Sequence, residues 1–102
     1  MLLLSVLVGL LVGCSSTEAV SVIDEVEVRP DGRTLAFAVS SCHGSPKATA
    51  EESAGEVRIS VRSDTSSNDD CADGATVKLD RPLGDREVVD AKTGRALRVW
   101  RT

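Results

Sequence analysis

Short stretches in which every second residue is apolar recur along this chain, and turn-forming residues separate them about every ten positions. The clearest stretch places Val57, Ile59 and Val61 on one side of an extended backbone, with charged or polar residues on the other. No segment shows the spacing of an amphipathic helix. The pattern predicts an all-β domain, a small antiparallel β-sandwich of about seven strands with an immunoglobulin-like architecture.

The N-terminal segment does not share this pattern. An apolar run of about 12 residues ends in Leu-Val-Gly-Cys at residues 11–14, a length typical of a signal peptide and too short to span a bilayer of roughly 30 Å. These four residues resemble the lipobox of bacterial lipoproteins. The resemblance implies that the chain is cleaved before Cys14, which is lipidated and becomes the mature N-terminus. The alternative is that residues 2–11 form a buried strand or helix of a cytosolic domain.

We therefore expect a signal peptide over residues 1–13, the lipidated cysteine and a short tether over 14–20, and the β-sandwich domain over 21–102. The mature part is long enough for one small domain. Lys and Arg total 12 against 16 Asp and Glu, and the net charge is −4. This acidic balance argues against a nucleic-acid partner and against a polybasic membrane surface.

The chain contains three cysteines. If Cys14 carries the lipid, Cys42 and Cys71 remain as an even pair in an exported, oxidising setting, where a disulfide is expected. A bridge across a loop of about 30 residues would stabilise the fold by about 3.5 kcal/mol. The alternatives are a redox site, for which there is no Cys-x-x-Cys motif, and a metal site.

The strands are expected where alternation is clearest and where turn residues interrupt it. They cover residues 25–29 and 35–39, which a Pro-Asp-Gly turn joins, then 47–52 as an edge strand, 56–62, 76–80, 88–89 and 96–100. The polar segment 63–74 is predicted to be a loop that the disulfide holds in place.

Residues 79–89 read Leu-Asp-Arg-Pro-Leu-Gly-Asp-Arg-Glu-Val-Val, and Asp90, Thr93 and Gly94 follow closely. This segment resembles the C-terminal signature of small lipoproteins and secreted proteins from actinobacteria. In that group two cysteines flank a strand pair, as Cys42 and Cys71 flank residues 57–61 here. The resemblance implies a compact, disulfide-linked β-domain and implies no particular activity.

Candidate catalytic and metal-binding residues are few. His43 is the single histidine, so any serine-hydrolase triad would need it, but no Gly-x-Ser-x-Gly motif is present and a surface-loop histidine is the simpler interpretation. His43, Cys42 and Cys71 together could bind copper or zinc if the cysteines were reduced. Four aspartates could bind calcium, although their spacing differs from that of an EF-hand and a solvated loop is the simpler interpretation: Asp64, Asp69, Asp70 and Asp73.

Two further features have a structural and a functional interpretation. Phe37 is expected in the core, and Trp100 is expected to cover an open end of the core, with a sugar-binding platform as the alternative. The segment Arg81–Arg86 could be a recognition loop. In the structural interpretation, which we favour, Leu83 plugs the core and Asp85 pairs with an arginine or caps a turn.

The sequence therefore predicts a cell-envelope lipoprotein, anchored through Cys14 to the outer face of a bacterial cytoplasmic membrane. Its domain is expected to be a non-catalytic binding or interaction module without a cofactor. It is expected to be monomeric, with a protein partner in the envelope and no nucleic-acid partner. The alternative function is metal handling, for copper or zinc, through His43, Cys42 and Cys71.

Overall fold

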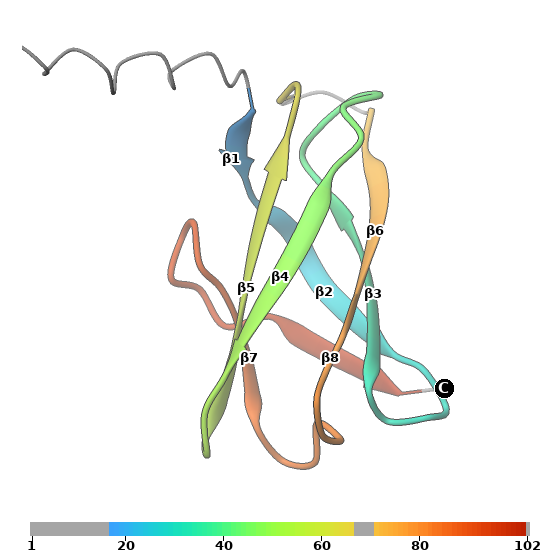
Figure 1. The fold of residues 1–102 in the computed structure, drawn as a ribbon, viewed down its shortest axis with the longest axis vertical. Coiled ribbons are helices and arrows are strands. Elements are labelled where there is room, and N and C mark those ends of the chain that lie inside the picture. The colour runs from blue at the N-terminus through green and yellow to red at the C-terminus, as the bar shows by residue number, and fades with distance from the viewer. Residues whose placement is uncertain (1–16, 67–70, 102) are drawn as a thin grey trace, which may run out of the picture.

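The computed structural model describes residues 17–66 and 71–101, and this part of the chain forms two packed β-sheets without a helix (Figure 1). The all-β fold is therefore confirmed. None of these residues belongs to a helix long and apolar enough for a bilayer crossing. The described residues form eight strands where about seven were expected: β1 (Glu18–Val20), β2 (Val22–Val28), β3 (Thr34–Val39), β4 (Lys47–Glu52), β5 (Glu56–Ser63), β6 (Asp73–Lys78), β7 (Glu87–Asp90) and β8 (Arg98–Arg101).

Each sheet contains four strands. In the first, which we call sheet A, β4 pairs along one side of β5, while β1 and β7 pair with successive parts of its other side. In sheet B the order is β6, β3, β2, β8. The pairs β5–β7 and β2–β8 are parallel and the others antiparallel, so the sandwich is mixed where a purely antiparallel one was expected. The parallel pairs arise because β7 and β8 each follow a crossover from the opposite sheet.

The hydrophobic core lies between the two sheets and comes from the residues whose alternation was visible in the sequence. Val57, Ile59 and Val61 of β5 face Leu35 and the other inward side chains of β3, all buried. Phe37 is also in the core, as predicted. Complete burial of one aliphatic side chain stabilises the folded state by roughly 1.5–3 kcal/mol. The buried apolar residues of β3 and β5 therefore make a large contribution to the stability of the fold.

The domain begins earlier than the sequence indicated. Residues 18–20 were assigned to the tether, but they form β1, which pairs with β5, and Val20 is 1 % exposed. The assignment of the tether to 14–20 is therefore wrong for its last three residues. The signal peptide over 1–13 and the lipidated Cys14 lie outside the described residues.

Strand β2 contains a bulge. Its pairing with β3 shifts between Val22 and Val26, and Asp24 adopts a positive φ of 54° within the shift. A bulge bends a strand and changes the direction in which its side chains point. Asp24, which alternation with Val22 and Val26 would turn inward, is therefore exposed, together with its neighbours Ile23 and Glu25.

Candidate functional site

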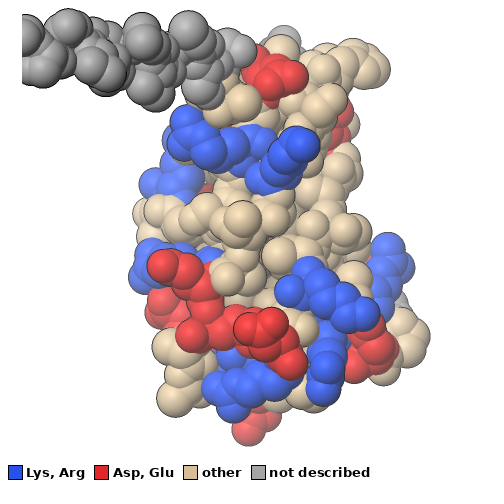
Figure 2. All heavy atoms as spheres, in the orientation of Figure 1, with Lys and Arg blue, Asp and Glu red and all other residues tan. Residues whose placement is uncertain are grey.

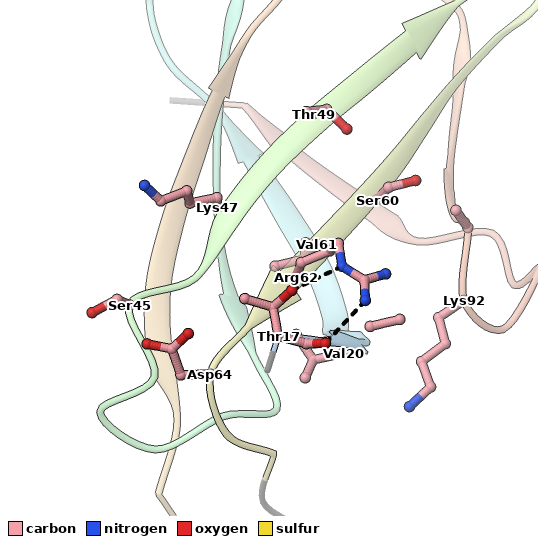
Figure 3. Close-up of a pocket in the computed structure, with 12 residues that line it drawn as sticks. Thr17, Val20, Ser45, Lys47, Thr49, Ser60, Val61, Arg62, Asp64 and Lys92 are labelled. Carbon is pink, nitrogen blue, oxygen red and sulfur yellow. Dashed lines mark hydrogen bonds between the residues drawn. The ribbon is translucent and has the colours of Figure 1, made fainter. Parts of the chain in front are cut away.

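A hollow of about 730 Å³ lies on the outer surface of sheet A, and we call it the cationic hollow (Figure 3). Strands β1, β4 and β5 and the turn after β7 form it. Three of its twelve lining residues are cations, Lys47, Arg62 and Lys92, and one is an acid, Asp64. The other lining residues are small, hydroxyl-bearing or aliphatic: Thr17, Ala19, Val20, Ser45, Thr49, Ser60, Val61 and Ala91.

Two of the cations are held together by the register of the sheet. Lys47 of β4 lies directly opposite Arg62 of β5, and both side chains are exposed on the outer face. Like charges at directly opposed positions destabilise a pair of strands. Figure 3 shows the ammonium group of Lys47 turned away from Arg62, the arrangement expected for two like charges. The pairing is explained if this surface has a role other than stability.

Arg62 is held in place by Thr17, the residue before β1. Its Nη2 donates to the Thr17 carbonyl at 3.0 Å and its Nε to the Thr17 hydroxyl at 3.3 Å. In Figure 3 the side chains of Arg62 and Lys92 extend toward the same end of the hollow. A guanidinium that is already oriented loses less conformational entropy when it binds an anion.

The position of Lys92 is set by the turn between β7 and β8. Asp90 is buried, and its carboxylate accepts hydrogen bonds from the Lys92 N–H at 3.1 Å and from the Thr93 hydroxyl at 3.1 Å. Gly94, with φ of 78°, and the Gly94 N–H bond to the Asp90 carbonyl close the turn. The Asp90, Thr93 and Gly94 of the sequence motif therefore build the turn that presents Lys92.

None of the three cations forms an ion pair within residues 17–66 and 71–101; the recorded ion pairs are all elsewhere. Figure 2 shows blue side chains across the upper part of the sheet A face, with acidic side chains directly above them and a mixed acidic and basic region below. The net charge of −4 for the whole chain thus conceals a local cationic surface. The cations and hydroxyl groups that line the hollow suit an anionic group, which they would bind by charge and by hydrogen bonds.

The predicted disulfide is present. Cys42 and Cys71 are joined with a Cα–Cα distance of 5.3 Å. The bridge holds the loop after β3 next to the start of β6, and His43 lies close enough that the ligand atoms of all three residues are within 4.8 Å. The three residues of the metal-site alternative therefore lie together. In the bridged state, however, the two thiolates that a metal site requires are absent.

Asp73 organises the loop that carries His43. Its carboxylate accepts hydrogen bonds from the Ser41 hydroxyl and from the N–H groups of His43 and Gly44, both at 3.0 Å. The Ser41 hydrogen bond, followed by the Gly44 N–H, lowers the pKa of Asp73 below its ordinary value. His43 is exposed, and its backbone N–H donates to Asp73.

The two candidate calcium ligands that the structure describes, Asp64 and Asp73, are not gathered into one cluster. Asp64 lines the cationic hollow, and Asp73 is engaged by the loop around His43. Asp69 and Asp70 lie outside the described residues. Of the residues that can be placed, only Cys42, His43 and Cys71 form a cluster of potential metal ligands.

In the segment Arg81–Arg86 the structural interpretation is confirmed for Leu83 and wrong for Asp85. Leu83 plugs the core at 1 % exposure, as expected. Asp85, however, is exposed, and the buried charged residue is Arg86, which pairs with Glu52 at 3.2 Å. A guanidinium has five N–H donors and can satisfy several carbonyls at once, which a carboxylate cannot do.

Trp100 does not cover the core. It is 50 % exposed on the outer face of sheet B, because Leu97 and Val99 are the residues of this segment that turn inward. The alternation from Leu97 to Trp100 was visible in the sequence and would have predicted the outward position.

The three cations escaped sequence analysis because they come from three separate elements, and cross-strand register is not visible in a sequence. Searches of protein-family models, of characterised proteins and of solved structures find no match to this chain. The resemblance of residues 79–89 to an actinobacterial signature therefore stays a prediction. The geometry of the surface is what indicates a function.

Proposed function

We propose that this protein is a lipoprotein of the bacterial cell envelope, anchored through Cys14, whose β-sandwich is a non-catalytic module that binds phosphate groups of anionic phospholipids in the cationic hollow. The supporting observation is that Lys47, Arg62 and Lys92 all line one hollow and that none of them forms an ion pair among the described residues. The lining contains hydroxyl groups but no imidazole that could act as a general base.

The distance to the membrane favours a lipid source for the anion. Thr17 lines the hollow and binds Arg62, and Cys14 is three residues upstream. Three extended residues span at most about 10 Å, which is close to the Debye length of about 8 Å at physiological salt. An anchored domain would thus hold its cations within the field of the headgroups, where each Lys or Arg contributes about 1 kcal/mol.

A vesicle-binding experiment tests the anion site apart from the anchor. The mature chain, residues 14–102 with Cys14→Ser and without the apolar segment 1–13, is sedimented with vesicles of phosphatidylglycerol and phosphatidylcholine, or of phosphatidylcholine alone. We expect binding to the anionic vesicles that is lost at high salt. Replacing Lys47, Arg62 and Lys92 by Gln should weaken it roughly a hundredfold. Soluble glycerol phosphate in a parallel titration reports whether the site also takes a free anion.

The matched control removes the same charge from the opposite end of the domain. Gln at Arg29, Arg33 and Lys78, three exposed cations around the β2–β3 turn, should leave vesicle binding nearly unchanged. Equal binding to neutral vesicles, or equal losses in the two triple variants, would contradict a specific anion site.

The anchor has its own measurement. Mass spectrometry of the N-terminal peptide from membrane fractions should show an N-terminus at Cys14 with acyl groups on that residue, and Cys14→Ser should abolish the acylation. An unmodified Cys14 in membrane fractions would contradict the anchor while leaving the anion site to the vesicle experiment.

A further inference from the structure

A second surface, on the outer face of sheet B, presents an oriented aromatic ring. Trp100 is 50 % exposed and lines a hollow of about 660 Å³ together with Ile23 and residues of β2 and β3. This hollow lies on the opposite sheet from the cationic hollow. It is therefore a separate candidate binding site.

The ring of Trp100 is held by its neighbours although it is exposed. Its Nε1 donates to the Glu25 carboxylate at 2.7 Å, and the Arg98 guanidinium lies 5.7 Å from the ring centroid in a cation–π contact. The bulge of β2 and the parallel pairing of β2 with β8 bring Glu25 to this position. An aromatic ring fixed before binding loses little entropy when a ligand stacks on it.

Beside the ring the sheet carries small side chains. One row of paired residues crosses sheet B from β8 to β6 and consists of Trp100, Glu27, Ala36 and Thr76. In the next row Ala38 lies opposite Gly74. The outer face is therefore a shallow shelf with the tryptophan standing at one edge, and a flat ligand could lie on the shelf against the ring.

The groups around the shelf favour a neutral sugar chain over other ligands. Carboxylates accept and guanidinium groups donate hydrogen bonds to hydroxyls, and both kinds line this hollow, from Asp24, Glu25, Glu27 and Arg101. Glu27 is paired with Arg29 at 3.1 Å, and Arg98 and Arg101 flank the ring, so neither sign of charge is in excess and the shelf suits a neutral ligand. A stable protein interface buries about 800 Å² per partner around an apolar centre, whereas Ile23 and Trp100 are the only large exposed hydrophobics of the described residues.

We propose that the Trp100 shelf binds a neutral polysaccharide, with the apolar face of a sugar ring stacked on Trp100 and its hydroxyls bound by Glu27 and Arg101. One aromatic ring with flanking polar groups is sufficient for this mode of binding. The site is independent of the cationic hollow, so either assignment can fail without the other.

Intrinsic fluorescence provides a direct measurement, because Trp100 is the only tryptophan and the chain has no tyrosine. The full chain with Cys14→Ser is titrated with chitotetraose, cellotetraose and mannotetraose. We expect at least one of these to move the emission to shorter wavelength in a saturable way. In calorimetry Trp100→Ala should weaken that binding by about tenfold, and Trp100→Phe should weaken it less.

Two further variants control the interpretation. Glu25→Gln leaves the ring in place but weakens the hydrogen bond that orients it, so it should reduce affinity without unfolding the domain. Lys92→Gln lies on the other sheet and should bind the saccharide as the parent does.

Three results would overturn the proposal. The first is an emission spectrum that none of the three saccharides changes at millimolar concentration. The second is a Trp100→Ala variant that binds as tightly as the parent. The third is an emission shift that follows protein concentration and a dimer in sedimentation, which would assign the shelf to a second copy of the chain.

Discussion

Arg86 joins two loops that are distant in sequence. Its guanidinium donates to the carbonyls of Leu83, Ser53, Arg81 and Pro82 over distances of 2.9–3.3 Å and pairs with Glu52, while its side chain is 6 % exposed. Glu52 also accepts the Asp80 N–H at 2.7 Å, and this bond is the largest cause of its lowered pKa. The loop after β6 and the β4–β5 turn therefore depend on a single cation.

Replacing Arg86 by Met should be among the most damaging single changes. It leaves the Glu52 carboxylate without its partner and several carbonyls without a donor, so we expect a loss of about 3–5 kcal/mol in the free energy of unfolding, measured with urea. Arg33→Met, an exposed site near the β2–β3 turn, should change it by less than about 0.5 kcal/mol. Similar losses in the two variants would show that Arg86 does not have this role.

Gly44 allows the loop around the disulfide to approach β5. A Cβ at this position would lie 2.0 Å from the Ser63 hydroxyl oxygen and 3.0 Å from the Thr65 backbone nitrogen. Gly44→Ala should therefore destabilise the fold by about 1–3 kcal/mol, whereas Gly74→Ala, with nothing within 4 Å, should not destabilise it by overpacking. Thermal unfolding of the two variants, followed by circular dichroism, is the comparison; equal midpoints would contradict the steric argument.

The β2–β3 hairpin owes its turn to Asp31. Its carboxylate accepts the N–H groups of Arg33 and Thr34, both at 2.9 Å, and the Thr34 hydroxyl at 2.8 Å. These bonds, the Arg33 N–H first, lower the pKa of Asp31 from 3.8 to about 2. Gly32 completes the turn with a φ of 73°.

This lowered pKa predicts acid sensitivity. Because the folded state holds Asp31 ionised more strongly than the unfolded chain does, its stabilisation is complete above about pH 4 and is lost as the pH falls toward 2. The urea midpoint of the parent should drop over this range, and Asp31→Asn should make that drop smaller. An unchanged pH profile in Asp31→Asn would mean that other carboxylates account for the acid transition.

Seven of the eight strands were predictable at least in part, and β1 was not. The interior of β5 and the core-facing residues of β3 follow directly from their valines, leucine, isoleucine and phenylalanine. Strand β1 consists only of Glu-Ala-Val, which is too short to show a pattern. It forms because it pairs with β5, and this pairing is a tertiary interaction that local sequence does not predict. The parallel placement of β7 and β8 depends on crossovers between the sheets, and local sequence does not encode them.

The candidate sites depend on the assembled molecule more than on any segment. The cationic hollow needs β4, β5 and the β7–β8 turn in one register, and the Trp100 shelf needs β8 beside β2. In contrast, the pairing of Cys42 with Cys71 was predictable, because only two cysteines remain in the expected domain. Counting the cysteines was sufficient to predict the disulfide, whereas the two hollows could be predicted only with knowledge of which strands are neighbours.

The disulfide links the loop after β3 to the start of β6, and its sequence separation is 29 residues. Its reduction should lower the free energy of unfolding by about 3.5 kcal/mol. A thiol assay on the denatured, unreduced Cys14→Ser chain should find no reactive cysteine. Two reactive thiols in protein purified from the envelope would contradict the bridged state and restore the thiolates that the metal alternative needs.

The parallel pairing of β2 with β8 places Val26 opposite Val99, so it joins residues from nearly the two ends of the domain sequence. Contacts between such distant residues slow folding, because the chain must close a large loop before it gains them. Sheet B therefore stays incomplete during synthesis until β8 has been made. The chain therefore spends most of its synthesis without the pairing that completes the sandwich, and if it is exported as proposed, it can be transported unfolded during that interval.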